Sequence, residues 1–150
     1  MRYYEDLNEG EQQESGTRTV TEAELLAFAR QYDPQYFHAD PEAARASTFG
    51  GLIASGIYTM AIWRQLDHEI AHDIAWICGV AWDNVRFPMA VRAGDTLRAR
   101  ATCLSKRASA KQPGRGVVTY QYVLTNQRGE TVFSCRSTNL IKRRAAHPDR

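Results

Sequence analysis

The sequence predicts an α+β fold, in which one antiparallel β-sheet packs around a long buried helix. Helical patterns are confined to the first half of the chain, and from residue 75 onward apolar and polar residues alternate with the period of a strand. Between these regions, segment 55–71 begins with residues that are apolar on nearly all sides, which is typical of a helix at the centre of a fold. We assign residues 1–142 to this single domain. The charged, proline-containing segment 143–150 is expected to be a disordered tail.

Composition narrows the class of protein. The chain is 43% hydrophobic and 24% charged, as is usual for a soluble globular protein, and its net charge of +2 is too small to predict binding to nucleic acid or to a membrane surface. No apolar stretch is long enough to span a bilayer, and residues 1–12 lack the apolar core of a signal peptide, so we expect a cytoplasmic protein. The 3 cysteines are Cys78, Cys103 and Cys135. They are far apart in the sequence, so we expect them to be reduced residues of the core or of strands.

The first helix is predicted by its start signal and by its apolar spacing. Thr21 and Glu24 match a capping box, in which the hydroxyl and the carboxylate each accept a hydrogen bond from a free amide of the first turn. We expect a helix of roughly three turns to follow, preceded by a short strand at residues 17–20. Its apolar face consists of Leu25, Phe28, Ala29 and Tyr32.

The central helix is expected at Ser55–Ala71. A short helical turn at residues 41–45 comes before it, because Asp40 is a favoured N-cap residue and Pro41 suits the first helical position. From Arg64 onward the central helix turns polar, and we expect this half to emerge into solvent.

Long antiparallel strands are predicted in the second half of the chain. One ends near Phe87, and residues 97–103 and 118–124 alternate apolar and polar side chains with period two. The turn-forming segment Asn126–Gly129 then predicts a hairpin into the last strand, at residues 131–141.

Residues 68–72 spell HEIAH, which matches the H-E-x-x-H pattern of zinc proteases. Such a site needs a further protein ligand, and no extension to another histidine follows. The pentapeptide also lies in the polar half of the helix, where Asp67 and Asp73 are expected to be surface charges. We therefore predict no metal site.

The segment from Asp33 to Gly56 carries the more promising chemistry. Asp33 and His38 lie on one predicted loop, because Pro34 stops the preceding helix and the aromatic residues before His38 argue against regular helix. An acid and an imidazole beside a helix N-terminus can hold a water and polarise a carbonyl, with the free Gly56 N–H as the donor to the carbonyl oxygen. The alternative is that these residues are turn, cap and hydrogen-bonding residues with no catalytic role.

Three segments resemble the MaoC-like acyl-CoA dehydratases, which include the (R)-specific enoyl-CoA hydratases. They are DPQYFH at 33–38, FGGLIASG at 49–56, and VRFP at 85–88 with VRAGDTL at 91–97. The resemblance implies a hot-dog fold, in which the sheet wraps the central helix, and a homodimer that binds acyl-CoA near its interface. It makes Asp33 and His38 the catalytic pair and Gly56 the oxyanion donor. Gln35 and Tyr36 depart from the family's asparagine and proline, and Ala61 stands in place of a frequent serine.

The resemblance thus predicts a hydratase that reversibly adds water to the α,β double bond of an enoyl thioester. His38 activates the water, Asp33 handles the proton on the α-carbon, and no cofactor is needed. The residues expected to contact substrate are Gln35, Phe37, Gly51, Ile53, Ser55 and Arg86. Contacts to the CoA phosphates are expected from basic residues near strand ends, namely Arg86, Arg92, Lys106, Arg107 and Lys111.

Two other functions remain open from the sequence. A thioesterase on the same fold would use a carboxylate on the central helix, but the first half of that helix carries none. A non-catalytic acyl-thioester binding protein would bind ligand without turnover, if Gln35 spoils the geometry of the catalytic pair.

Overall fold

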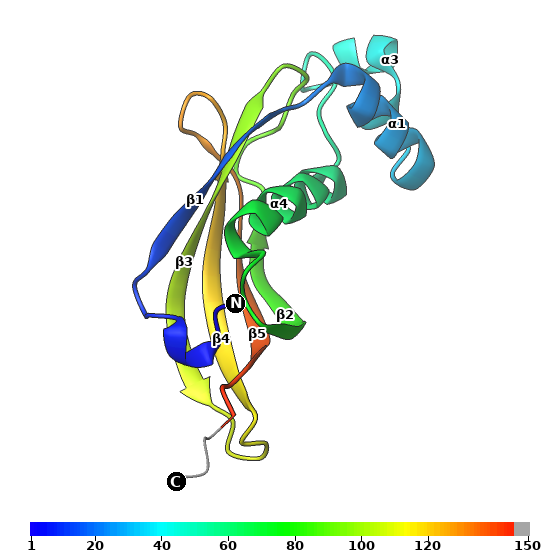
Figure 1. Cartoon of the computed structure of the whole chain (residues 1–150). Coiled ribbons are helices and arrows are strands. Elements are labelled where there is room, and N and C mark those ends of the chain that lie inside the picture. The colour runs from blue at the N-terminus through cyan, green and yellow to red at the C-terminus, as the bar shows by residue number, and fades with distance from the viewer. Residues whose placement is uncertain (146–150) are drawn as a thin grey trace, which may run out of the picture.

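The computed structural model describes residues 1–145 and is built around one antiparallel sheet (Figure 1). Its strands lie in the order β1-β3-β4-β5-β2. The helix α4 (Gly56–Ala71) lies against one face of this sheet. The prediction of an α+β hot-dog fold with a long central helix is confirmed. The strands are β1 (Gln12–Thr19), β2 (Trp76–Arg86), β3 (Thr96–Ala108), β4 (Arg115–Thr125) and β5 (Thr131–Lys142).

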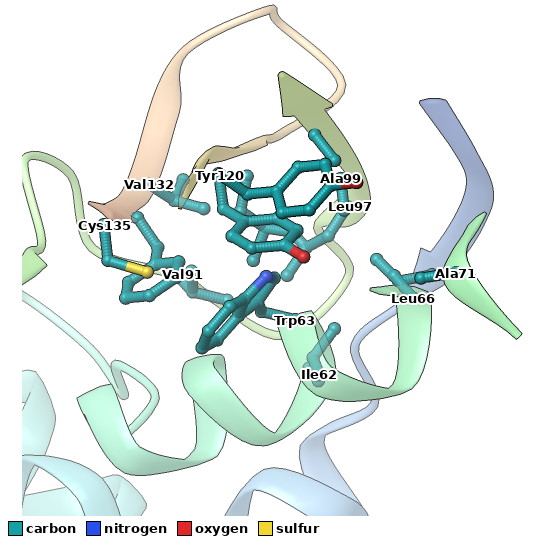
Figure 2. Packing of buried hydrophobic residues seen from close by; sticks show 14 of the residues in the cluster. Ile62, Trp63, Leu66, Ala71, Val91, Leu97, Ala99, Tyr120, Val132 and Cys135 are labelled. Carbon is teal, nitrogen blue, oxygen red and sulfur yellow. The ribbon is translucent and has the colours of Figure 1, made fainter. Parts of the chain in front are cut away.

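The core lies between α4 and the sheet. Figure 2 shows the Trp63 side chain reaching from α4 into the side chains of the sheet, among them Tyr120 and Cys135. Trp63 is fully buried, and its ring packs against Tyr122 and Phe133 with centroids 5.0 and 5.1 Å apart. Buried and partly exposed residues alternate along the whole of β4, as the period-two pattern predicts. Burial of large aromatic side chains on both layers holds the helix on the sheet.

The short helices α1 (Glu22–Tyr32), α2 (Tyr36–Ala39) and α3 (Pro41–Arg45) cluster beyond one end of the sheet. Asp40 caps α3 as predicted, accepting from two backbone amides. The expectation of an irregular loop around His38 was wrong, because residues 36–39 form the single turn α2. Pro34 does not prevent this turn, since it lies ahead of it, and the Gln35 carbonyl accepts hydrogen bonds from the amides of His38 and Ala39.

The predicted capping box is only half correct. The Thr21 hydroxyl accepts from the Glu24 amide at 3.2 Å, but the Glu24 carboxylate pairs with Arg18 and accepts from the Tyr58 hydroxyl at 3.0 Å. Burial, with Glu24 as a second cause, raises the pKa of Tyr58 to about 12. A tertiary hydrogen bond between α1 and α4 therefore replaces the second hydrogen bond of the predicted capping box.

The first strand is longer than predicted. β1 pairs with β3 from Gln12 opposite Thr102 to Thr19 opposite Thr96, with an irregularity between Glu14 and Thr17. The predicted strand at 17–20 covers only its end. Its sequence, QQESGTRT, has no apolar alternation, so backbone pairing with β3 produces this strand.

The second half of α4 is only partly exposed to solvent: His68 and Glu69 are exposed, but the opposite face is buried. Leu66, Asp67 and Ala71 are buried, and the Asp67 carboxylate forms an ion pair with Arg64 at 2.8 Å. The expectation that Asp67 is a surface charge was wrong, because it lies four residues after Trp63 and shares the helix face that turns toward the sheet.

Other expectations concern the ends of the chain and the membrane. Arg143 and Arg144 form ion pairs with Glu5 and Asp6, while residues 146–150 of the expected tail lie outside the described residues. Within the described part, no helix is both long and apolar enough to cross a membrane.

The strand β2 forms one end of the sheet and is unusually exposed. Every residue of β2 after Trp76 is exposed, although the strand pairs with β5 along its length. Val80 and Trp82 keep 54% and 49% of their surface in solvent. A long edge strand with apolar side chains is a typical site of pairing with another chain. The apolar side chains exposed on β2 and just after it are Ile77, Val80, Trp82, Val85, Phe87 and Met89.

Candidate functional site

Asp33 and His38 face each other at the junction of α1 and α2. Asp33 is the residue that ends α1, where its amide donates to the Ala29 carbonyl at 2.9 Å. His38 lies in α2 and is buried. The His38 Nε2 and Asp33 Oδ2 atoms are 3.6 Å apart, which is too long for a direct hydrogen bond. The two groups can therefore be bridged by one small molecule or reacting atom.

The ring of His38 is held in one tautomer. Its Nδ1 lies 2.7 Å from the Ile53 carbonyl oxygen. A carbonyl only accepts, so Nδ1 carries the proton, and in the neutral imidazole the lone pair is on Nε2. Phe37 packs edge-on against the ring, with centroids 4.5 Å apart. The basic nitrogen of His38 thus points toward Asp33.

The Asp33 carboxylate is positioned by Ser55. The Ser55 hydroxyl donates to Asp33 Oδ2 at 2.7 Å and accepts from the Ile57 amide at 3.3 Å as the N-cap of α4. Ser55 is itself buried. This side chain therefore orients Asp33 and links it to the start of α4, and direct contact of Ser55 with substrate stays a prediction.

Gly56 is the first residue of α4, and its amide belongs to the free N–H groups of the first helical turn. The Phe87 ring covers this position. A Cβ on Gly56 would lie 3.0 Å from the nearest ring atom, so a larger residue would displace the ring. The helix dipole adds positive potential at this end, which favours a developing negative charge on an oxygen beside the amide.

The other predicted substrate-binding residues lie around this pair in different ways. The Ile53 side chain is buried, and the backbone of this residue makes the contacts to the site. Its carbonyl accepts a hydrogen bond from His38, and its amide donates to the Phe37 carbonyl at 3.1 Å. The Gln35 side chain is exposed and does not cap α2. Arg86 is exposed at the end of β2.

Gly51 belongs to a shallow pocket of about 260 Å³ that two arginines, Arg45 and Arg92, also line. Arg92 donates to the Phe49 carbonyl at 2.7 Å, and the Phe49 ring packs against Phe37. This pocket is therefore next to the helical turn α2, which carries His38.

The remaining basic candidates lie elsewhere. Lys106, Arg107 and Lys111 are near the β3–β4 turn, at the opposite end of the sheet from α1 and α3 in the same protomer (Figure 1). Lys106 donates to the Tyr4 carbonyl at 2.9 Å and lies over the Tyr4 ring.

The HEIAH segment does not form a cluster of ligands. His68 and His72 are exposed, and the Glu69 carboxylate accepts from the Gly16 amide at 2.9 Å. Among the described residues no group of three or more histidine, cysteine, aspartate and glutamate side chains is arranged to hold a metal ion.

Two features of the site were missed by reasoning from the sequence. The role of Ser55 toward Asp33 depends on a contact across 22 positions of the chain, and the Phe87 contact with Gly56 joins β2 to α4. The serine could have been found as an N-cap candidate before the central helix. Nothing in the local sequence indicates the position of Phe87.

Comparisons with known proteins concern the sequence and the fold. A model of the MaoC-like domain matches residues 6–127. The uncharacterised protein YdeM of Bacillus subtilis is 35% identical over 127 residues, which cover 83% of this chain and 87% of the relative. The 3-hydroxyacyl-thioester dehydratase Z of Mycobacterium tuberculosis is 34% identical over 87 residues, 56% of this chain and 58% of that protein.

Solved structures are similar over almost the whole chain. The MaoC-like dehydratase from Rhodospirillum rubrum is 38% identical, with a TM-score of 0.90 over 97% of this chain and 99% of that one. A Mycobacterium tuberculosis protein described as having a double hot-dog fold is 16% identical, with a TM-score of 0.82 over 99% of this chain and 46% of its own length. At that identity the likeness concerns the fold alone.

Proposed function

Because the chain belongs to the MaoC-like domain family, we propose that it is a hydratase that reversibly adds water across the α,β double bond of an enoyl thioester. The observation that carries the proposal is the pairing of a basic His38 Nε2 with the Asp33 carboxylate, beside the free amide at the start of α4. A base, an acid and an oxyanion donor are the groups that this reaction needs.

In the direction of hydration, the thioester carbonyl accepts a hydrogen bond from the Gly56 N–H, which stabilises the enolate that forms. His38 Nε2 takes one proton from the water as its oxygen adds to the β-carbon. The imidazolium passes this proton to the Asp33 carboxylate, which delivers it to the α-carbon of the enolate, so that both groups return to their starting states. Dehydration follows the same steps in reverse.

The thioester itself makes the α-hydrogen acidic, so the proposed reaction uses no metal or redox cofactor. Coenzyme A is the proposed carrier. The support is the pocket lined by Arg45 and Arg92 next to α2, because guanidinium groups match phosphate oxygens in geometry and charge. The name of the mycobacterial dehydratase, which acts on a 3-hydroxyacyl thioester, supports the thioester class.

We also propose that the protein works as a homodimer through β2. The support is the free edge of this strand and its exposed apolar side chains, which a second copy of β2 would cover. Pairing of this kind extends one sheet into the next and brings the partner close to Phe87 and Gly56.

The reaction is tested by the ultraviolet absorbance of a series of enoyl-CoA substrates of increasing chain length, with a thiol reagent in parallel. We expect the absorbance of the conjugated double bond to fall without release of free thiol. Release of thiol would instead indicate a thioesterase, for which the buried Asp67 on α4 would be the carboxylate to test. Saturable binding with neither signal would indicate a protein that only binds acyl thioesters.

Removing the hydroxyl of Ser55 should impair this activity. Ser55→Gly is expected to lower kcat/KM about tenfold, because the Asp33 carboxylate loses a hydrogen bond of about 1.4 kcal/mol to a charged group. Glycine is a suitable replacement, since it costs an N-cap only a few tenths of a kcal/mol. Initial rates of hydration check this prediction. Ser55→Thr keeps the hydroxyl and should retain most of the activity; equal losses in both variants would contradict the positioning role.

A further inference from the structure

Asn84 is the only residue of β2 with a positive φ angle. Its φ is 52°, and the other positive φ angles in the described part of the chain all belong to glycines. Residues with a Cβ avoid this left-handed region, and asparagine is one of the few that adopt it without a large cost. Such a conformation persists only where the surrounding structure maintains it, and it is often found beside a functional site.

Asn84 lies in a β-bulge. Asp83 is paired with Arg136 of β5, and the next paired residue, Arg86, is opposite Ser134. The three steps from 83 to 86 on β2 thus match the two steps from 136 to 134 on β5, so β2 contains one extra residue here. An extra residue shifts the alternation of side chains, and the residues after it change from one face of the sheet to the other.

This change of face puts Phe87 against α4. Before the bulge, Trp82 faces the helix, where its ring packs against Trp63 with centroids 5.1 Å apart. Because 87 is an odd number of positions after 82, a regular strand would place Phe87 on the opposite face, away from α4. In the structure Phe87 covers Gly56, and its ring packs against the buried Phe133 with centroids 5.5 Å apart. The bulge is therefore what gives Phe87 its position.

The Phe87 ring forms a wall beside the Gly56 amide, which is the proposed oxyanion donor. Three ring atoms lie between 3.0 and 3.3 Å from the place that a Cβ on Gly56 would occupy, so no water fits between the ring and this side of the residue. A hydrogen bond to a developing negative charge is stronger where water is excluded, because solvent no longer screens it. A ring on the other face of the sheet would leave the amide open to solvent.

We propose that Asn84 is a positioning residue for hydration. Its left-handed conformation holds the bulge in β2, and the bulge turns Phe87 onto Gly56, where the ring keeps water away from the enolate oxygen. The inference rests on the proposed function, which puts the thioester carbonyl at the Gly56 amide. Phe87 transfers no proton and acts as a wall, and Asn84 acts only through Phe87.

The first measurement follows the position of the ring without any substrate. The NMR signal of the Gly56 amide proton is sensitive to the ring current of Phe87, and Phe87→Ala is expected to shift it. Asn84→Val should shift the signal in the same direction, because a β-branched residue is strongly disfavoured at positive φ. Asn84→Gly adopts this conformation freely and should keep the wild-type signal.

The second measurement is kcat for hydration of a short enoyl-CoA, at a temperature where thermal unfolding shows every variant to be folded. Phe87→Ala and Asn84→Val are each expected to lower kcat about tenfold, which is less than the loss of about a hundredfold or more that removal of an oxyanion donor causes. KM should change less than kcat, because the oxyanion interaction strengthens in the transition state. Combining the two substitutions should give no further loss, because both act through the same ring.

Asp83→Val is the matched control, because it puts the same side chain at the neighbouring position, whose φ is not positive. It should leave both the Gly56 signal and kcat unchanged. An unshifted signal in Asn84→Val would overturn the proposal, as would an equal loss of kcat from Asn84→Val with and without Phe87→Ala. A loss in Asn84→Gly as large as that in Asn84→Val would also overturn it. If the wild type hydrates no enoyl thioester, the proposed reaction is wrong, whereas the amide signal still decides whether Asn84 positions Phe87.

Discussion

Asp33→Asn and His38→Ala are each expected to lower kcat/KM for hydration by about a factor of a thousand, within the range that general acid–base groups contribute. The reason is the geometry of the pair. Nε2 of His38 and Oδ2 of Asp33 lie 3.6 Å apart, and neither has another group in the described site that can take over its proton transfer. Residues that act as one unit are not additive, so the double variant should be about as slow as the slower single variant. Initial rates from the loss of enoyl absorbance measure all three.

His72→Ala is the control for the dyad, because His72 is an exposed histidine at the end of α4 and far along the helix from Gly56. Its activity should equal that of the wild type. Thermal unfolding of each variant separates a loss of chemistry from a loss of structure. If a folded His38→Ala protein kept most of its activity, the assignment of His38 as the base would be wrong.

Trp63→Ala is expected to lower the free energy of unfolding by about 3–5 kcal/mol, the usual cost of truncating a large buried aromatic side chain. Trp63 is fully buried and packs against Trp82, Tyr122 and Phe133, so its removal leaves a cavity between α4 and three strands. A loss of this size is a large fraction of the stability of a typical domain. Urea unfolding followed by circular dichroism measures it.

Trp63→Phe gives the comparison for this prediction. Phenylalanine keeps an aromatic ring in the core and removes the indole N–H, which is buried without a hydrogen-bond partner in the described structure. The smaller cavity is thus offset by the loss of an unsatisfied donor, and the cost should be clearly below that of alanine. Equal costs for both variants would show that ring packing at Trp63 contributes little.

The sequence was sufficient for the parts of the fold that depend on local patterns. The alternation along β4, the Asp40 cap of α3 and the apolar start of α4 each lie within a few residues of the chain, and all are present in the structure. The close approach of Asp33 and His38 is local in the same sense. Five positions separate them, so a helix end and one further turn are enough to make them face each other.

Tertiary structure changed several of these local expectations. Glu24 was expected to complete its own capping box, but it bonds to Tyr58 from α4, 34 positions away. β1 has no strand pattern of its own and is formed by pairing with β3. In both cases a partner that is distant in the sequence offers a stronger interaction than the local one.

By itself, the sequence determined the fold class, the central helix and the proximity of Asp33 and His38, because each is indicated by patterns within short segments of the chain. Only the tertiary structure decided what surrounds them. Ser55 reaches Asp33, Phe87 covers Gly56, and Asp67 becomes buried instead of lying in solvent. The physical reason is that burial and hydrogen-bond partners depend on which strands pack against α4. The backbones of β1 and β3 lie close to α4, and side chains of β2, β4 and β5 pack around Trp63. These strands are distant from the helix in the sequence and leave no mark on its local pattern.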